Sequence, residues 1–249
     1  MLRFRSILRL TAAALTTSLC AAPQTPAATT RETLEFGIEW RLITAGKARF
    51  VWTGTPGSSQ VRLKLDSGGL VSRLYQVDDD YTATLGENLC AQSTTLLAHE
   101  GSRNRDTRVT FDAAAGRASY LEKDLIKNTT AAREVEIPPC VHDVIGALMV
   151  LRRMSIEPGK SAQIPVSDGK KFVQVRIESQ RREDIKTANG IRKTIRYEAF
   201  LFDDLLFRRS GHLHIWLTDD ERRLPVQLQV KMNLAIGTIT FRLEKEDRS

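Results

Sequence analysis

Cysteine is scarce in this 249-residue sequence, and three cysteines exclude a miniprotein held together by disulfides. Basic residues exceed acidic ones by seven, and by four (34 minus 30) once an N-terminal leader with three arginines is set aside. No basic block stands out, which excludes a dedicated nucleic-acid binder. The sequence also lacks a Gly-x-Ser-x-Gly elbow, a glycine-rich phosphate loop, a His-Glu-x-x-His motif and a Cys-x-x-Cys pair. We therefore expect no catalytic activity and no cofactor.

The first 22 residues have the pattern of a secretory signal peptide, in which three arginines precede a short apolar stretch and small residues. Residues 23–31 are predicted to form a flexible tail. The apolar stretch of the leader is about half as long as a membrane span requires, and no longer apolar run follows, so we expect an exported, periplasmic protein without a transmembrane segment. Lipoprotein anchoring at Cys20 is the alternative, but Leu19 stands where a small residue is usual, which favours cleavage after Ala21 or Ala22.

The rest of the chain alternates apolar and polar residues with a period of two, the pattern of strands with one buried face. The first strand shows it most plainly, with Leu34, Phe36, Ile38 and Trp40 at alternate positions. About a dozen such segments predict a single all-β domain over residues 32–249. Because open twisted sheets rarely exceed about ten strands, we expect an antiparallel barrel or half-barrel.

Helical spacing interrupts the strand pattern after Pro138-Pro139. Apolar residues recur at three- and four-residue intervals over about 141–153, and they predict one helix covered on most sides and packed against the sheet. A barrel with such a helix encloses space for a ligand. The predicted cavity lining combines apolar strand faces with this helix: Phe36, Ile38, Trp40, Phe50, Trp52, Val144, Leu148 and Leu151.

Three further features have two interpretations each. Cys90 and Cys140 form an even pair that predicts a disulfide in an oxidising compartment, although two buried free thiols are the alternative. The run 78–80 of three aspartates lacks the alternating ligand spacing of calcium loops and is predicted to be a solvated loop. His212 and His214 share one strand face and could bind a metal ion, although paired histidines facing water are commonplace and a third ligand is needed.

One stretch near the C-terminus, Trp216-Leu217-Thr218-Asp219-Asp220-Glu221-Arg222-Arg223-Leu224-Pro225-Val226, resembles the signature of an exported bacterial family, domain of unknown function 3108. Ala45-Gly46-Lys47-Ala48, the segment 143–152 and Val166-Ser167-Asp168-Gly169-Lys170 resemble its other landmarks in the same order. The resemblance implies an all-β envelope domain behind a leader and brings no catalytic residues. The signature residues Trp216, Asp219, Asp220, Leu224 and Pro225 are interpreted as structural: a strand, a polar turn and the start of the next strand.

These observations leave three hypotheses. The first is a non-catalytic periplasmic protein whose curved sheet binds an apolar or amphipathic envelope component, such as a lipid or an envelope polymer. The second is a structural or protein-interaction module of the envelope with no small ligand. The third is a metal-assisted hydrolase that uses His212 and His214. The partner is not identified by any motif.

Overall fold

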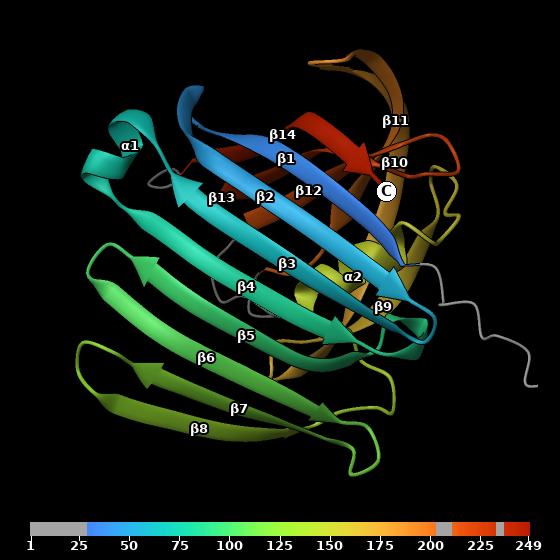
Figure 1. Cartoon of the computed structure of the whole chain (residues 1–249). Helices are drawn as coiled ribbons and strands as arrows, with labels where there is room; N and C mark the ends of the chain where they lie inside the picture. The colour runs from blue at the N-terminus through green and yellow to red at the C-terminus, as the bar shows by residue number, and fades with distance from the viewer. Residues whose placement is uncertain (1–28, 203–210, 233–236) are drawn as a thin grey trace, which may run out of the picture.

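One antiparallel sheet of fourteen strands makes up most of the molecule (Figure 1). The computed structural model describes residues 29–202, 211–232 and 237–249, so the predicted leader lies outside the described residues. The sheet curls without closing, and the prediction of an all-β half-barrel is confirmed. In the described part of the chain, no helix is long and apolar enough to cross a membrane.

The sheet order is β8-β7-β6-β5-β4-β3-β2-β1-β14-β13-β12-β11-β10-β9. The helical elements are α1 (Gly69–Leu74), a 3-10 turn η1 (Glu87–Leu89) and α2 (Val144–Leu151). The strands are β1 (Thr30–Trp40), β2 (Ile43–Thr55), β3 (Ser58–Ser67), β4 (Val77–Leu85), β5 (Ala91–Glu100), β6 (Arg103–Asp112), β7 (Arg117–Asp124), β8 (Thr129–Glu136), β9 (Ser161–Ser167), β10 (Phe172–Thr187), β11 (Gly190–Ala199), β12 (Gly211–Thr218), β13 (Pro225–Met232) and β14 (Thr238–Arg248).

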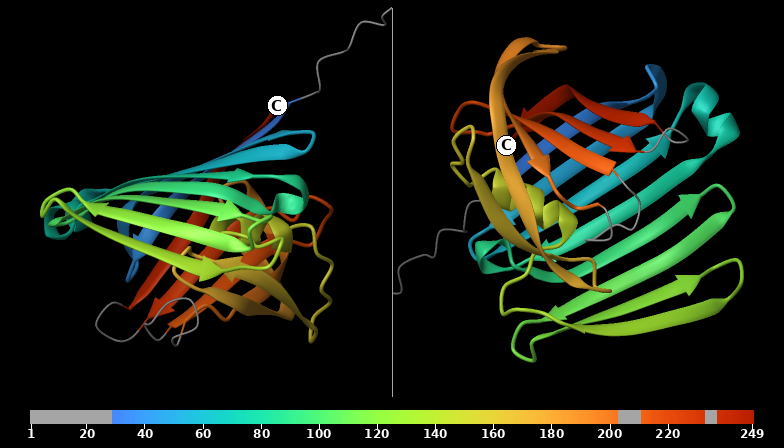
Figure 2. Two further views of the ribbon diagram at one scale, coloured as in Figure 1. Left: turned by 90° about the horizontal axis from the view of Figure 1, so that it is seen from below. Right: turned by 180° about the vertical axis from the view of Figure 1, so that it is seen from behind.

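The two ends of the described chain meet at the centre of the sheet. β1 to β8 extend in one direction, the chain then crosses the concave side through α2, and β9 to β14 return so that β14 pairs with β1 (Figures 1 and 2). Arg31 and Ser249 exchange both backbone hydrogen bonds. Thr30 and Arg31, which the sequence assigned to a flexible tail, are therefore part of the first strand.

The two edge strands are β8 and β9. No hydrogen-bond ladder joins them, but the β9–β10 hairpin reaches the opposite wall. Lys170 Nζ lies 4.5 Å from the centre of the Tyr120 ring, and a Cβ atom on Gly169 would lie 2.5 Å from Val109 Cγ1. Gly169 also has a φ of 81°, so both the turn and the close approach require glycine there.

The helix predicted over 141–153 is shorter in the structure. Asp143 caps it by accepting hydrogen bonds from the backbone N–H groups of Ile145 and Gly146, so the helix begins after this residue. His142 is extended and pairs with Val166 of β9 as a parallel bridge. This bridge explains why the apolar periodicity of the sequence starts before the helix does.

A disulfide joins Cys90, at the end of η1, to Cys140, three residues before the α2 cap, with 5.1 Å between the Cα atoms. It closes a sequence separation of 50 residues. The bond therefore fixes the point at which the chain enters the concave side of the sheet.

Replacing both cysteines by alanine should lower the free energy of unfolding by about 4 kcal/mol, because the unfolded chain regains the freedom that the loop removes. Urea unfolding of the oxidised protein, the reduced protein and the variant measures this. The reduced protein should match the variant, and identical midpoints for oxidised and reduced protein would contradict the prediction.

Candidate functional site

Helix α2 occupies one half of the concave side and is fixed at its first residue. Tyr81 of β4 donates a hydrogen bond of 2.7 Å to Oδ2 of Asp143, the residue that caps the helix. Burial raises the pKa of Asp143 and raises that of the Tyr81 hydroxyl well above its ordinary value. The cap therefore couples the helix to the middle of the sheet through a buried carboxyl.

At its other end, α2 is fixed by a buried ion pair. Arg152 forms a bidentate ion pair with Glu32 of β1, with Nη1 2.5 Å from Oε2 and Nη2 3.0 Å from Oε1. The side chains are only 10% and 6% exposed. Arg152 Nε also donates to the carbonyl of Arg223 at 3.0 Å, and Nη2 donates to that of Arg222 at 3.3 Å. The guanidinium thus joins the helix, β1 and the β12–β13 turn.

This turn is the signature found in the sequence. Asp220 Oδ1 accepts hydrogen bonds from the Thr218 hydroxyl and from the backbone N–H groups of Arg222 and Arg223. Thr218 and Leu224 close the turn through two further bonds. The turn therefore holds the two carbonyl groups that receive Arg152.

The remaining signature residues also have structural contacts. Trp216 is buried and donates its indole N–H to Glu183 at 2.7 Å, and Asp219 accepts from Arg182 at 2.8 Å. Leu224 is buried and Pro225 begins β13. None of the five signature residues lines either of the two pockets described next.

The half of the concave side that α2 does not fill contains a cavity of about 940 Å³. It opens at the end of the sheet where Figure 1 shows α1 and the β1–β2 turn. Its wall is mainly apolar: Ile38, Trp40, Ala45, Leu65, Val71, Leu74, Tyr75, Val77, Met232, Ile239 and Phe241. Polar residues complete it: Asp66, Ser67, Glu100, Ser102 and Arg103.

Beside this cavity the concave face carries charged side chains, of which Asp79 is buried and the others are partly exposed. Arg105 pairs with Glu100, and its Nη1 lies 3.7 Å from Glu122 Oε2. Asp79 lies in β4, not in the solvated loop that the sequence predicted, because the aspartate run alternates along a strand. Asp78 and Asp80 pair with Lys64 on one face, while Asp79 is buried on the other. Burial and the neighbouring Glu100 raise the pKa of Asp79.

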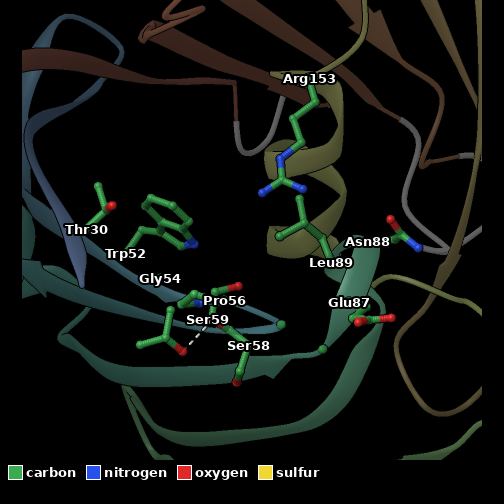
Figure 3. A pocket seen from close by; sticks show the side chains of 13 residues that line it. Thr30, Trp52, Gly54, Pro56, Ser58, Ser59, Glu87, Asn88, Leu89 and Arg153 are labelled. Carbon is green, nitrogen blue, oxygen red and sulfur yellow. Dashed lines mark hydrogen bonds between the residues drawn. The ribbon is translucent and has the colours of Figure 1, made fainter. Parts of the chain in front are cut away.

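A second, polar pocket of about 640 Å³ lies at the other end of the sheet. In Figure 3 the Arg153 side chain extends from α2 toward Trp52. The indole Nε1 of Trp52 and the hydroxyl of Ser59 are buried without a hydrogen-bond partner in the described residues. A Cβ atom on Gly54 would lie 2.6 Å from the Trp52 ring, so this glycine permits the ring to rest on the strand.

The histidine pair lies outside both pockets. Glu198 lies between the two side chains, 2.7 Å from His212 Nδ1 and 3.7 Å from His214 Nε2. Burial lowers the pKa of His214. No group of three or more His, Cys, Asp or Glu side chains suited to a metal ion occurs among the residues described by the structure.

Of the eight side chains predicted to line a cavity, Ile38 and Trp40 line the apolar one, and Trp52 lines the polar pocket. Phe36, Phe50 and Leu151 are buried in the packed core, and Val144 and Leu148 pack against it. The helix contributes nothing to the apolar cavity because it fills the other half of the concave side.

The sequence patterns did not identify Glu32 and Arg152 as partners, nor the α1 side chains that line the cavity. Glu32 stands two positions before Leu34, on the buried face of the same alternating pattern. A charged residue at a buried strand position signals a partner. The identity of that partner, 120 residues away, carries no local signal.

These features define a curled antiparallel half-barrel with an internal helix and an apolar cavity. The model of the family described as "Protein of unknown function (DUF3108)" matches residues 35–244, and the chain belongs to this family, as its motifs predicted. No curated protein matches the chain.

One of the solved structures that match the chain shares its fold. A β-barrel-like protein of domain of unknown function DUF1849 from Brucella abortus superposes with a TM-score of 0.56 at 9% identity, covering 88% of this chain and 98% of its own. A putative exported protein with YmcC-like fold from Bacteroides fragilis matches with a TM-score of 0.34 at 7% identity, covering 88% and 95%. At 9% identity, the similarity to the Brucella abortus protein is evidence for the fold alone.

Arg152→Met should lower the free energy of unfolding by about 3–5 kcal/mol, because Glu32 stays buried without a partner. The neighbouring Arg153→Met is the matched control, since this exposed arginine forms no ion pair within the described chain, and it should cost less than about 0.5 kcal/mol. Urea unfolding measures both. Replacing Glu32 by Leu together with Arg152→Met should recover much of the loss, and equal costs for the two single variants would contradict the assignment.

The raised pKa of Asp79 has a defined effect on stability. The folded state holds this proton more tightly than the unfolded state, so the free energy of unfolding falls as the pH rises from the ordinary carboxyl pKa, about 3.9, through the raised folded value. In Asp79→Asn that contribution disappears, and the variant should gain stability relative to wild type with rising pH. Thermal unfolding across this range measures the difference, and parallel profiles would contradict it.

Proposed function

We propose that this protein is an exported, non-catalytic carrier or receptor that binds an apolar or amphipathic component of the cell envelope in its apolar cavity. The observation that carries the proposal is the cavity of about 940 Å³ between the sheet and α1. Ligand pockets typically measure 300–1,000 Å³ and combine an apolar wall with a few polar groups. This cavity has both properties.

The arrangement of the lining favours an amphipathic ligand. Trp40, Ile239 and Phe241 offer the apolar wall, whereas Glu100 and Arg103 offer charged groups of both signs from the β5–β6 region. An acyl chain would contact the wall, and a polar head would meet these charges. The leader pattern and the disulfide support export to the periplasm of a bacterial envelope.

A protein-interaction module is the alternative, and the edge strand β8 favours it. All but one of its residues are exposed, and it pairs only with β7, so its outer backbone groups are open to another strand. Arg133, Glu134 and Glu136 place charge along this edge, which disfavours unspecific pairing. We rank this function second because the edge explains no feature of the cavity.

Binding of cis-parinaric acid, a fluorescent fatty acid, tests the carrier function. The wild-type protein should bind about one equivalent. Val71→Trp, which places an indole at the cavity wall, should weaken binding at least tenfold. Ile191→Trp, at an exposed apolar site on the β10–β11 hairpin, should leave binding unchanged.

Native mass spectrometry of protein purified from a periplasm without detergent then identifies the natural ligand class. A lipid or amphiphile at one copy per protein is the expected result. A protein that carries nothing and does not bind the fatty acid, beside a known lipid carrier handled identically, would contradict the proposal and favour the interaction module.

A further inference from the structure

Exposed apolar side chains gather at one end of the half-barrel. Ten large hydrophobic side chains are exposed in the described part of the chain, and seven of them lie in or directly beside α1, the β1–β2 turn and the β7–β8 turn. Figure 1 shows these three segments along the same side of the molecule. We call this set the apolar rim: Leu42, Ile43, Leu70, Leu74, Tyr75, Leu125 and Ile126.

The rim differs from ordinary surface hydrophobicity, in which apolar side chains are scattered singly. Leu42 is 91% exposed and Leu70 is 63% exposed, and both protrude from short connections. Leu42 also has a φ of 68°, an unfavourable conformation for a branched side chain. A leucine held outward in this way gains nothing within the fold that would offset this conformation.

Positive charge accompanies the apolar rim. Four of the connections at this end, residues 41–42, 68–76, 101–102 and 125–128, contain Arg41, Arg73 and Lys127 and no acidic residue. The strand residues that directly flank them add Arg103 and two carboxylates, Glu100, which pairs with Arg105, and Asp124. Asp124 is engaged within its own turn, where it accepts hydrogen bonds from the N–H groups of Ile126 and Lys127. The end of the molecule that exposes leucines therefore also exposes an excess of cations.

The apolar rim adjoins the cavity at α1. Leu74 and Tyr75 belong to both the rim and the cavity wall, and Val71 on the same short helix lines the cavity. A ligand that enters here passes the exposed side chains before it reaches the interior. Apolar ligands reside in membranes. Because the rim shares residues with the cavity wall, a membrane is the surface that we expect the rim to contact.

We propose that the apolar rim docks on the surface of a bilayer that contains anionic lipids, so that the cavity mouth faces the membrane. This inference rests on the proposed function, since it gives that function its source of ligand. The leucines enter the boundary between headgroups and acyl chains, and the four basic residues meet the lipid phosphates. Interfacial proteins combine these two contributions, apolar burial and attraction to anionic lipid.

Cosedimentation with vesicles tests the docking surface. Wild-type protein should bind vesicles of equal parts phosphatidylglycerol and phosphatidylcholine at least tenfold more tightly than pure phosphatidylcholine, and less tightly at high salt. The double variant Leu42→Ser, Leu70→Ser should bind the mixed vesicles at least tenfold more weakly. Leu121→Ser, on the outer face of β7 and 46% exposed, is the control and should bind like wild type.

Charge reversal provides the second arm. Arg73→Glu combined with Lys127→Glu should abolish the preference for anionic vesicles. The control is Arg49→Glu combined with Arg62→Glu, two exposed arginines on the outer faces of β2 and β3, and it should retain the preference. Equal losses in both pairs, or in both leucine variants, would overturn the docking surface.

Fatty-acid binding in the cavity and vesicle binding by the apolar rim can be tested independently. Leu42 and Leu70 do not line the cavity, so their double variant should still bind cis-parinaric acid, and Val71→Trp should still bind vesicles. Wild-type protein that binds the fatty acid but no vesicle overturns the docking surface alone. If sedimentation instead reveals a dimer that the leucine variant abolishes, a second copy of the chain covers the rim and the membrane inference is wrong.

Discussion

The position of α2 depends on one buried guanidinium. Arg152 forms a bidentate ion pair with Glu32 and donates hydrogen bonds to two carbonyl groups of the β12–β13 turn. It therefore connects α2, β1 and this turn, which are far apart in the sequence. An unpaired charge at this depth would be strongly unfavourable, and the contacts are therefore mutually required. The family signature acquires a physical meaning from this contact: its aspartate shapes the turn that receives the helix.

The same constraint divides the interior. Held by Asp143 and Tyr81 at its first turn and by Arg152 at its last, α2 packs into one half of the curled sheet. No helix of the described chain packs into the other half in this way, and that half contains the cavity. The packed half and the cavity therefore have a common cause, since the contacts that position α2 also keep it away from the apolar space.

Much of the fold was readable from the sequence. Period-two alternation predicted the strands, and three- and four-residue spacing predicted the helix, with its start misplaced because residues 141–142 extend toward β9. The site was less accessible. Which apolar faces pack and which line a space depends on how far α2 reaches, a long-range property that alternation does not encode. Asp79 illustrates this limit. Three adjacent aspartates indicated a polar loop, whereas all three belong to strand β4 and Asp79 lies on its buried face.

The pairing of β1 with β14 has a consequence for biogenesis. Glu39 and Arg242 form an ion pair across this seam, 203 residues apart in the sequence. The middle of the sheet is thus assembled from the earliest and the latest parts of the domain, and loop closure on that scale is slow. A chain that emerges in order from a ribosome therefore cannot complete the β1–β14 pairing until β14 has been released, so the unfinished chain stays incompletely folded until the end of synthesis.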